Sequence, residues 1–134
     1  MNVESKNETK IAVTAMDEKG LLSKLDTRFG RCNSFVIVNV VDSKIKDHKI
    51  LSNVDSTASQ GAGISSSERI VNEGVNIVIT GNIGPNAIRV LQESNVEVYS
   101  ATSDSTVEDA VQLYIDNKLK LISFPTVGGH FGQQ

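Results

Sequence analysis

Short apolar runs rich in β-branched residues dominate the first part of the chain. Residues 10–15 (KIAVTA) form one such run, which predicts a strand. Residues 34–41 (SFVIVNVV) are almost continuously apolar, which is typical of a strand buried on both faces. A turn at 42–44 and a third strand over residues 48–53 then predict a β-hairpin. The stretch 16–33 between the first two strands has no sustained period and reads as a long loop.

From residue 61 onward the pattern changes to a regular alternation of helices and strands. A helix is expected over 64–71 and a strand over 75–80 (VNIVIT). A second helix should begin at Pro85, because proline is favoured at the first helical position. A strand at 97–100 follows, and the capping-box sequence at 105–108 predicts the start of a last helix. The inward stripe of that helix is Val107, Ala110, Val111 and Tyr114.

The expected order of elements is therefore β-β-β-α-β-α-β-α. Strand–helix–strand units require parallel pairing with right-handed crossovers, whereas the opening hairpin adds antiparallel strands. We expect a single α/β domain over residues 10–122, with a mixed five-stranded sheet and helices on both faces. The strand order should be 3-2-1-4-5, with the second strand antiparallel to the rest. Residues 1–9 are expected to be a disordered lead-in and residues 123–134 a flexible Gly-rich tail.

The composition is that of an ordinary soluble protein, and its charge and hydrophobicity argue against nucleic acid and a membrane as partners. Its 134 residues suffice for one domain with its own core. Thirteen basic and sixteen acidic residues give a net charge of −3, which argues against a nucleic-acid surface. No apolar segment approaches the length of a membrane span. A polar N-terminus without signal-peptide character and a single cysteine favour a cytoplasmic location.

Three loops should meet at the carboxyl ends of the parallel strands, where α/β sheets bind ligands. They are residues 27–32 (TRFGRC), the stretch from Gly61 to Gly63, and the tight loop from Gly81 to Gly84. The helix that begins at Pro85 would present free N–H groups and a partial positive charge to an anion. The alternative is a tight strand-to-helix turn without a ligand. The glycines at 61 and 63 could serve either to turn the chain or to let its backbone approach a ligand.

Cys32 is the only cysteine and has Arg28 and Arg31 beside it. Their charges would lower the pKa of the thiol and make its thiolate available as a metal or cluster ligand. The alternative is a small buried residue at the start of a strand, where free cysteine is usually found. His130 is a second candidate metal ligand, and the alternative is that it belongs to a disordered tail. The sequence shows no arrangement of a nucleophile and a base, which favours a non-enzymatic role.

Three motifs in order resemble the dinitrogenase iron–molybdenum cofactor biosynthesis family, which includes NifX, NifY and the C-terminal domain of NifB. R-F-G-R-C-x-x-F, at residues 28–35, resembles its first signature. G-A-G followed by V-N-I-V-I-T-G-N-I-G-P-N-A resembles its second, and V-E-V-Y followed by T-V-E-D-A-V its closing strand and helix. The resemblance covers about residues 10–118, which is nearly the whole expected domain.

The resemblance implies a ribonuclease H-like three-layer fold and a protein that binds or carries iron–sulfur or molybdenum-containing clusters. Many members have histidine where this chain has Arg28, and arginine cannot coordinate a metal because it stays protonated. An anionic cluster could still be held by charge and backbone N–H groups, with Cys32 as the one thiolate. The positions that the resemblance singles out are Arg28, Phe29, Gly30, Arg31, Cys32, Gly81, Gly84 and Pro85.

The leading hypothesis is a non-catalytic carrier of a labile iron–sulfur or iron–molybdenum type cluster, with metal-cofactor assembly proteins as its partners. A second hypothesis is a domain that holds phosphate or carboxylate at the helix start formed by Gly84 and Pro85. A third is an interaction module that regulates a partner and binds nothing small.

Overall fold

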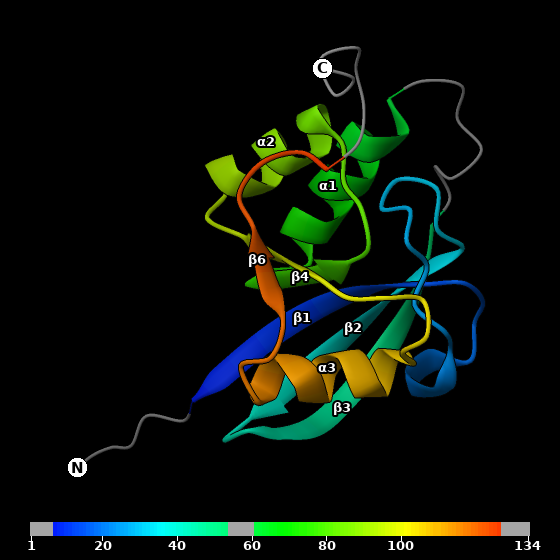
Figure 1. Cartoon of the computed structure of the whole chain (residues 1–134), viewed down its shortest axis with the longest axis vertical. Helices are drawn as coiled ribbons and strands as arrows, with labels where there is room; N and C mark the ends of the chain where they lie inside the picture. Colours follow the sequence, from blue (N-terminus) through cyan, green and yellow to red (C-terminus); the bar gives the residue numbers. More distant parts are fainter. Residues whose placement is uncertain (1–6, 54–60, 127–134) are drawn as a thin grey trace.

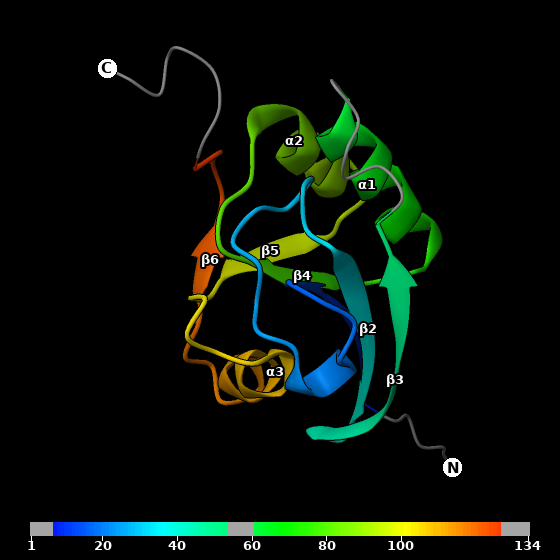
Figure 2. The ribbon, with the colours of Figure 1, turned by 90° about the vertical axis from the view of Figure 1, so that its right-hand side faces the viewer.

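The computed structural model describes residues 7–53 and 61–126, which form one mixed sheet between two layers of helices (Figures 1 and 2). Helices α1 (Ala62–Asn72) and α2 (Pro85–Glu93) cover one face of the sheet, and α3 (Val107–Ile115) covers the other. A short 3₁₀ turn, η1 (Gly20–Leu22), lies in the long loop after the first strand. No helix in these ranges is long and apolar enough to cross a membrane.

The described residues contribute six strands to the sheet, in the order β3-β2-β1-β4-β5-β6. β1, β4 and β5 run parallel, β2 is antiparallel to both of its neighbours, and β6 is antiparallel to β5. The expected order of the first five strands and the antiparallel second strand are thus confirmed. The ribonuclease H-like label stays a prediction. The strands are β1 (Glu8–Ala15), β2 (Ser34–Val41), β3 (Lys44–Ser52), β4 (Ile77–Thr80), β5 (Glu97–Ser100) and β6 (Lys120–Ile122).

The expectation of five strands is wrong, because β6 forms a sixth. Its three residues pair with β5, with Ile122 opposite Val98. Of these three residues only Ile122 is buried. The segment therefore lacks the apolar run by which a central strand is predicted from sequence.

Successive side chains of the central strands point to opposite faces of the sheet and pack into two separate hydrophobic cores, because side chains alternate along a strand. On β2, Phe35 and Ile37 pack with α1 and α2, whereas Val36 and Val38 pack with α3. β4 repeats this division, with Val78 facing the first core and its neighbours facing the second. The apolar run of β2 is therefore buried on both faces, as expected.

Both ends of the expected domain need correction. β1 begins at Glu8 and not at residue 10, because Glu8 and Thr9 pair with Val41 and Val40 of β2. At the other end, Thr126 folds back onto the loop after β4: its N–H donates to the Ile83 carbonyl at 2.9 Å. Residues 123–126 are therefore attached to the domain, and residues 127–134 lie outside the described ranges.

The capping box of α3 lies one residue later than expected. Thr106 is the N-cap, its hydroxyl accepts a hydrogen bond from the Asp109 N–H, and the Asp109 carboxylate accepts one from the Thr106 N–H. The expected cap, Ser105, instead accepts a backbone hydrogen bond from Leu25 with its carbonyl. Val107 donates to the Ser23 carbonyl, so the loop after β1 fixes where the helix starts.

Candidate functional site

A cleft of about 410 Å³ opens at the carboxyl ends of β1 and β4. Its walls come from three segments: 27–31 after β1, 61–64 at the start of α1, and 82–87 at the start of α2. The volume falls within the range of roughly 300–1,000 Å³ that is usual for small-ligand sites. The structure thus brings together eight of the expected positions, namely Arg28, Phe29, Gly30, Arg31, Gly61, Gly63, Gly84 and Pro85.

Gly81 does not line the cleft but holds two of its walls together. The Asn82 N–H donates to the Thr27 carbonyl at 2.8 Å, and the Phe29 N–H donates to the Asn82 carbonyl at 3.3 Å. A Cβ at Gly81 would lie 2.6 Å from the Thr27 Cβ and 2.7 Å from its Cα. Such distances are far inside van der Waals contact, so the pairing of the two loops requires a glycine here.

A buried asparagine that sequence reasoning missed anchors the same loop. Asn53, which follows β3, donates from its amide nitrogen to the carbonyls of Gly30 at 3.1 Å and Cys32 at 3.0 Å. Its amide oxygen accepts a hydrogen bond from the Ser66 hydroxyl of α1 at 3.1 Å. One side chain therefore connects the loop after β1 to the helix across the cleft. A single asparagine at a strand end carries no sequence signal for this role.

The two helices that begin at the cleft lack the caps that helices usually have. Gly61 and Gly84 are the N-caps of α1 and α2, and neither provides a side-chain hydrogen bond. Neither first turn contains an acidic residue. By contrast α3, which begins away from the cleft, has a complete capping box with Glu108 and Asp109 in its first turn. Of these three helices, only α3 has carboxylate side chains of the protein itself at its N-terminus.

The starts of α1 and α2 lie close together, because only small side chains separate them. A Cβ at Gly63 would lie 3.4 Å from the Ala87 Cβ. The Ser67 hydroxyl lies 2.6 Å from the Gly63 carbonyl and 3.3 Å from the Ala87 carbonyl, within hydrogen-bond distance of both. The N–H groups of both first turns and their partial positive charges therefore face one site.

Arg28 is paired with an aspartate that sequence reasoning did not weigh. Its Nε and Nη2 donate to the two carboxylate oxygens of Asp26, each at 3.0 Å, and its backbone N–H donates to the same carboxylate. The Asp26 side chain is 5% exposed and that of Arg28 is 64% exposed. Hydrogen bonds to Asp26 raise the pKa of Arg28 further. Arg28 thus lines the cleft with its charge largely balanced by Asp26.

Cys32 lies in the hydrophobic core and does not line the cleft. Its side chain is fully buried, and its Sγ donates a hydrogen bond to the Phe29 carbonyl at 3.3 Å. Burial, together with the nearby Asp26 carboxylate, raises the pKa of the thiol to about 12. The expectation that Arg28 and Arg31 lower this pKa is wrong, because desolvation and the Asp26 carboxylate raise it by more than the hydrogen bonds to the thiol lower it.

This raised pKa predicts a loss of stability at high pH that depends on Cys32. The thiol of the unfolded chain ionises near pH 8.5, whereas the folded protein keeps its proton until about pH 12. The unfolded state therefore releases a proton first, and the free energy of unfolding should fall as pH rises above about 9. The expected loss between pH 8 and pH 10.5 is about 2–3 kcal/mol. Urea unfolding at pH 8 and pH 10.5 measures it.

The comparison variant for this measurement is Cys32→Ala, which keeps every other titrating group. Its stability should fall less than that of the wild type over the same pH interval. Parallel losses in the two proteins would show that Cys32 titrates normally and is accessible to solvent.

The donor groups of the cleft suit an anion better than a bare metal ion. None of the described residues that line it is a cysteine, histidine, aspartate or glutamate. Over residues 7–53 and 61–126 no group of three such side chains lies close enough to hold a metal. What the cleft offers is guanidinium and backbone N–H groups, which bind anions. His130, the other candidate ligand, lies outside the described residues.

Comparison with known proteins places the chain among related sequences. Residues 10–117 match the family described as "Dinitrogenase iron-molybdenum cofactor". The chain is 35% identical over 98 residues to MJ0580 of Methanocaldococcus jannaschii, an alignment that covers 73% of this chain and 82% of that protein.

Solved structures share the fold over nearly the whole chain. The apo form of the orange protein from Desulfovibrio gigas superposes with a TM-score of 0.79 at 31% identity, covering 90% of this chain and 98% of that one. TM1290 of Thermotoga gives a TM-score of 0.75 at 26% identity, with 90% and 99% covered.

Proposed function

Since the chain belongs to the dinitrogenase iron–molybdenum cofactor family, we propose that it is a non-catalytic carrier whose cleft holds an anionic metal–sulfur cluster as cargo. The proteins that load and receive the cluster during cofactor assembly would be its partners, in the cytoplasm. The cargo is either an iron–sulfur or a molybdenum-containing cluster.

The observation that carries this proposal is the pair of uncapped helix starts at one cleft. α1 and α2 both begin there with a glycine N-cap and no acidic residue, whereas α3 has its own capping box. A helix N-terminus stabilises a nearby anion by about 0.3–1 kcal/mol, and more where the site is partly buried. Two such termini, with Arg31 and the paired but exposed guanidinium of Arg28 in the wall, favour an anionic cargo.

Binding by charge and N–H groups also suits the release that a carrier requires. A cluster locked by several thiolates would leave slowly, whereas outer contacts can be exchanged for those of an acceptor. This mode of binding needs no thiolate ligand. The burial of Cys32 supports a cleft in which Cys32 does not contact the cluster. The cluster would keep its own sulfides as ligands and bind as a preformed anion.

The proposal predicts that cluster retention depends on the arginines and not on Cys32. Purified protein is incubated anaerobically with iron and sulfide or, separately, with molybdate and sulfide, then desalted. We expect a coloured, substoichiometric complex that is lost as ionic strength rises, because salt screens the attraction. Cys32→Ala should keep the colour. Arg28→Gln combined with Arg31→Gln should weaken retention on the order of tenfold, about 1.4 kcal/mol.

Glutamine is used at residue 28 because its amide can still donate to the buried Asp26 carboxylate. Lys44→Gln combined with Lys46→Gln, on the edge strand β3, is the matched control and removes two positive charges far from the cleft. Loss of colour in Cys32→Ala with retention in the arginine variant would replace this proposal by thiolate ligation.

The second candidate function, binding of phosphate or carboxylate, is favoured by the same helix starts. It predicts that inorganic phosphate shifts the amide resonances of residues 84, 86, 87, 63 and 64 at millimolar concentration, while no cluster is retained after desalting.

A further inference from the structure

The segment that follows β6 exposes a large apolar surface although it is firmly attached to the domain. Phe124 is 78% exposed and Leu121 is 46% exposed. Gln92 of α2 donates to the Ser123 carbonyl at 3.0 Å, and Thr126 exchanges hydrogen bonds with the backbone of Ile83 at 2.9 and 2.8 Å. Phe124 therefore stands in solvent between two anchored neighbours and not on a loose end.

A hollow of about 570 Å³ lies beside this segment. Residues 120–126 form one wall, and Gly81, Asn82 and Ser100, at the ends of β4 and β5, form the other. Asn82 also lines the cleft described above, so the hollow and the cleft are neighbours on one edge of the sheet. An apolar side chain from another molecule could enter the hollow against Phe124 and Leu121.

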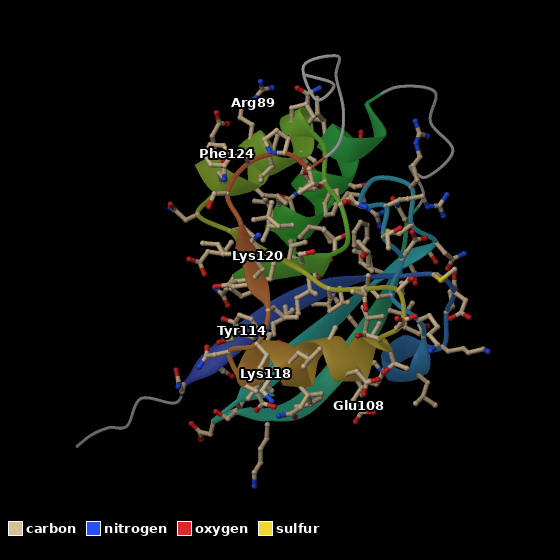
Figure 3. All side chains as sticks on the ribbon, viewed as in Figure 1. Arg89, Glu108, Tyr114, Lys118, Lys120 and Phe124 are labelled. Carbon is tan, nitrogen blue, oxygen red and sulfur yellow. The ribbon has the colours of Figure 1, made fainter. Side chains whose placement is uncertain are left out.

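We call the exposed side chains of Leu121 and Phe124, with the hollow beside them, the β6 surface. Three cations lie along this side of the molecule: Arg89, on α2 beyond Phe124, and Lys120 and Lys118 in the direction of α3 (Figure 3). Lys118 and Lys120 lie in the same segment as Leu121. Arg89 lies three residues before Gln92 and so on the same face of α2, the face that contacts residue 123. In the described part of the chain these three side chains have no ion pair and no hydrogen bond. Two carboxylates also lie near, Glu93 at the end of α2, four residues after Arg89, and Glu97, which accepts from the Tyr99 hydroxyl.

The opposite edge of the sheet is built differently. β3 bears Lys44, Lys46 and Lys49 among its nine residues, and Lys49 forms an ion pair with Glu73 at 2.8 Å. The large apolar side chain that β3 exposes is Ile50, at 40%, and no exposed phenylalanine or tyrosine of the described residues lies beside it. At the β6 surface an exposed aromatic and an exposed aliphatic side chain lie together, as they do in interaction sites. The cations around them would favour a partner of opposite charge.

We propose that the β6 surface docks an acidic segment of a partner protein, which inserts an apolar side chain into the hollow and pairs its carboxylates with Lys118, Lys120 and Arg89. Charge decides between this occupant and a second copy of the chain. A second copy seated on the same surface would bring its own Lys118 and Lys120 against these cations, and like charges repel. The inference stands whether or not the neighbouring cleft holds a cluster.

The test uses a defined acidic probe on the full-length protein. The probe is an acetylated, amidated pentapeptide with a central leucine and two glutamates on each side. At millimolar concentration it should shift the amide resonances of residues 118–124, 81–82 and 100, and added salt should weaken the binding. Lys120→Glu should weaken it on the order of tenfold, because attraction becomes repulsion. Phe124→Ser should also weaken it, by removing the apolar contact.

Lys46→Glu on β3 is the matched control, since it makes the same charge change on the other edge and should leave binding unchanged. A peptide with lysines in place of the glutamates should not bind. The proposal is overturned if millimolar acidic peptide leaves residues 118–124 unshifted, or if Lys46→Glu weakens binding as much as Lys120→Glu. It is also overturned if sedimentation shows a wild-type dimer that Phe124→Ser dissociates, because the occupant is then a second copy.

Discussion

Replacing Gly84 with aspartate should stabilise the fold and at the same time abolish anion retention in the cleft. Gly84 is the N-cap of α2 with φ −86° and ψ 175°, an extended conformation that any residue adopts. An aspartate there can accept from the N–H groups of Asn86 or Ala87. Because glycine is itself tolerated as an N-cap, this change should add only about 0.3–0.5 kcal/mol to the free energy of unfolding. Its carboxylate would take the place of the external anion and repel it. Retention of the cluster after desalting should fall by more than about tenfold.

The opposite signs of the two effects make this substitution informative. Chemical denaturation measures the first, and anaerobic gel filtration of the reconstituted protein measures the second. Gly84→Asn is the matched control, because asparagine caps the helix without a charge and should weaken retention less. If Gly84→Asp is more stable yet retains the cluster fully, the start of α2 takes no part in binding.

The arrangement of the sheet was predictable because its signals are local. An almost continuous run of apolar, mostly β-branched residues predicts β2. The alternation of strands and helices after residue 61 requires parallel strands joined by crossover helices. The start of α3 was off by one residue, because contacts of Ser105 and Val107 with the loop after β1 decide it. β6 escaped prediction for a similar reason, since three residues with one buried side chain gain their strand conformation from pairing with β5.

The candidate site was predictable in place but not in chemistry. Topology alone brings the loops after β1 and β4 to one edge, which is why most of the chosen glycines and arginines line the cleft. The charge state of Cys32 depends on burial and on Asp26, and neither can be read from its neighbours in sequence. Asp26 lies two residues before Arg28, a spacing at which aspartate often bonds the backbone. This spacing is the one feature of the sequence that could have indicated the pairing of Asp26 with Arg28.

Replacing Gly81 with alanine should separate the two loops that form the cleft wall. The new Cβ would lie 2.6 Å from the Thr27 Cβ and 2.7 Å from its Cα, and the latter is backbone that no side-chain rotation can clear. We expect a loss of about 1–3 kcal/mol in the free energy of unfolding. The Asn82 and Phe29 N–H groups, which pair the loops, should exchange with solvent faster, as hydrogen exchange would measure. Cluster retention should fall because Arg28 and the start of α2 move apart.

Gly63→Ala is the control, since it adds the same methyl group at the same cleft. Its Cβ would meet the Ala87 Cβ at 3.4 Å, an ordinary contact, and alanine favours the helix that Gly63 occupies. Stability should therefore stay equal or rise, while Gly81→Ala falls. Equal stability in both variants would show that the loop after β1 yields easily, and that the close approach at Gly81 does not hold the cleft wall in place.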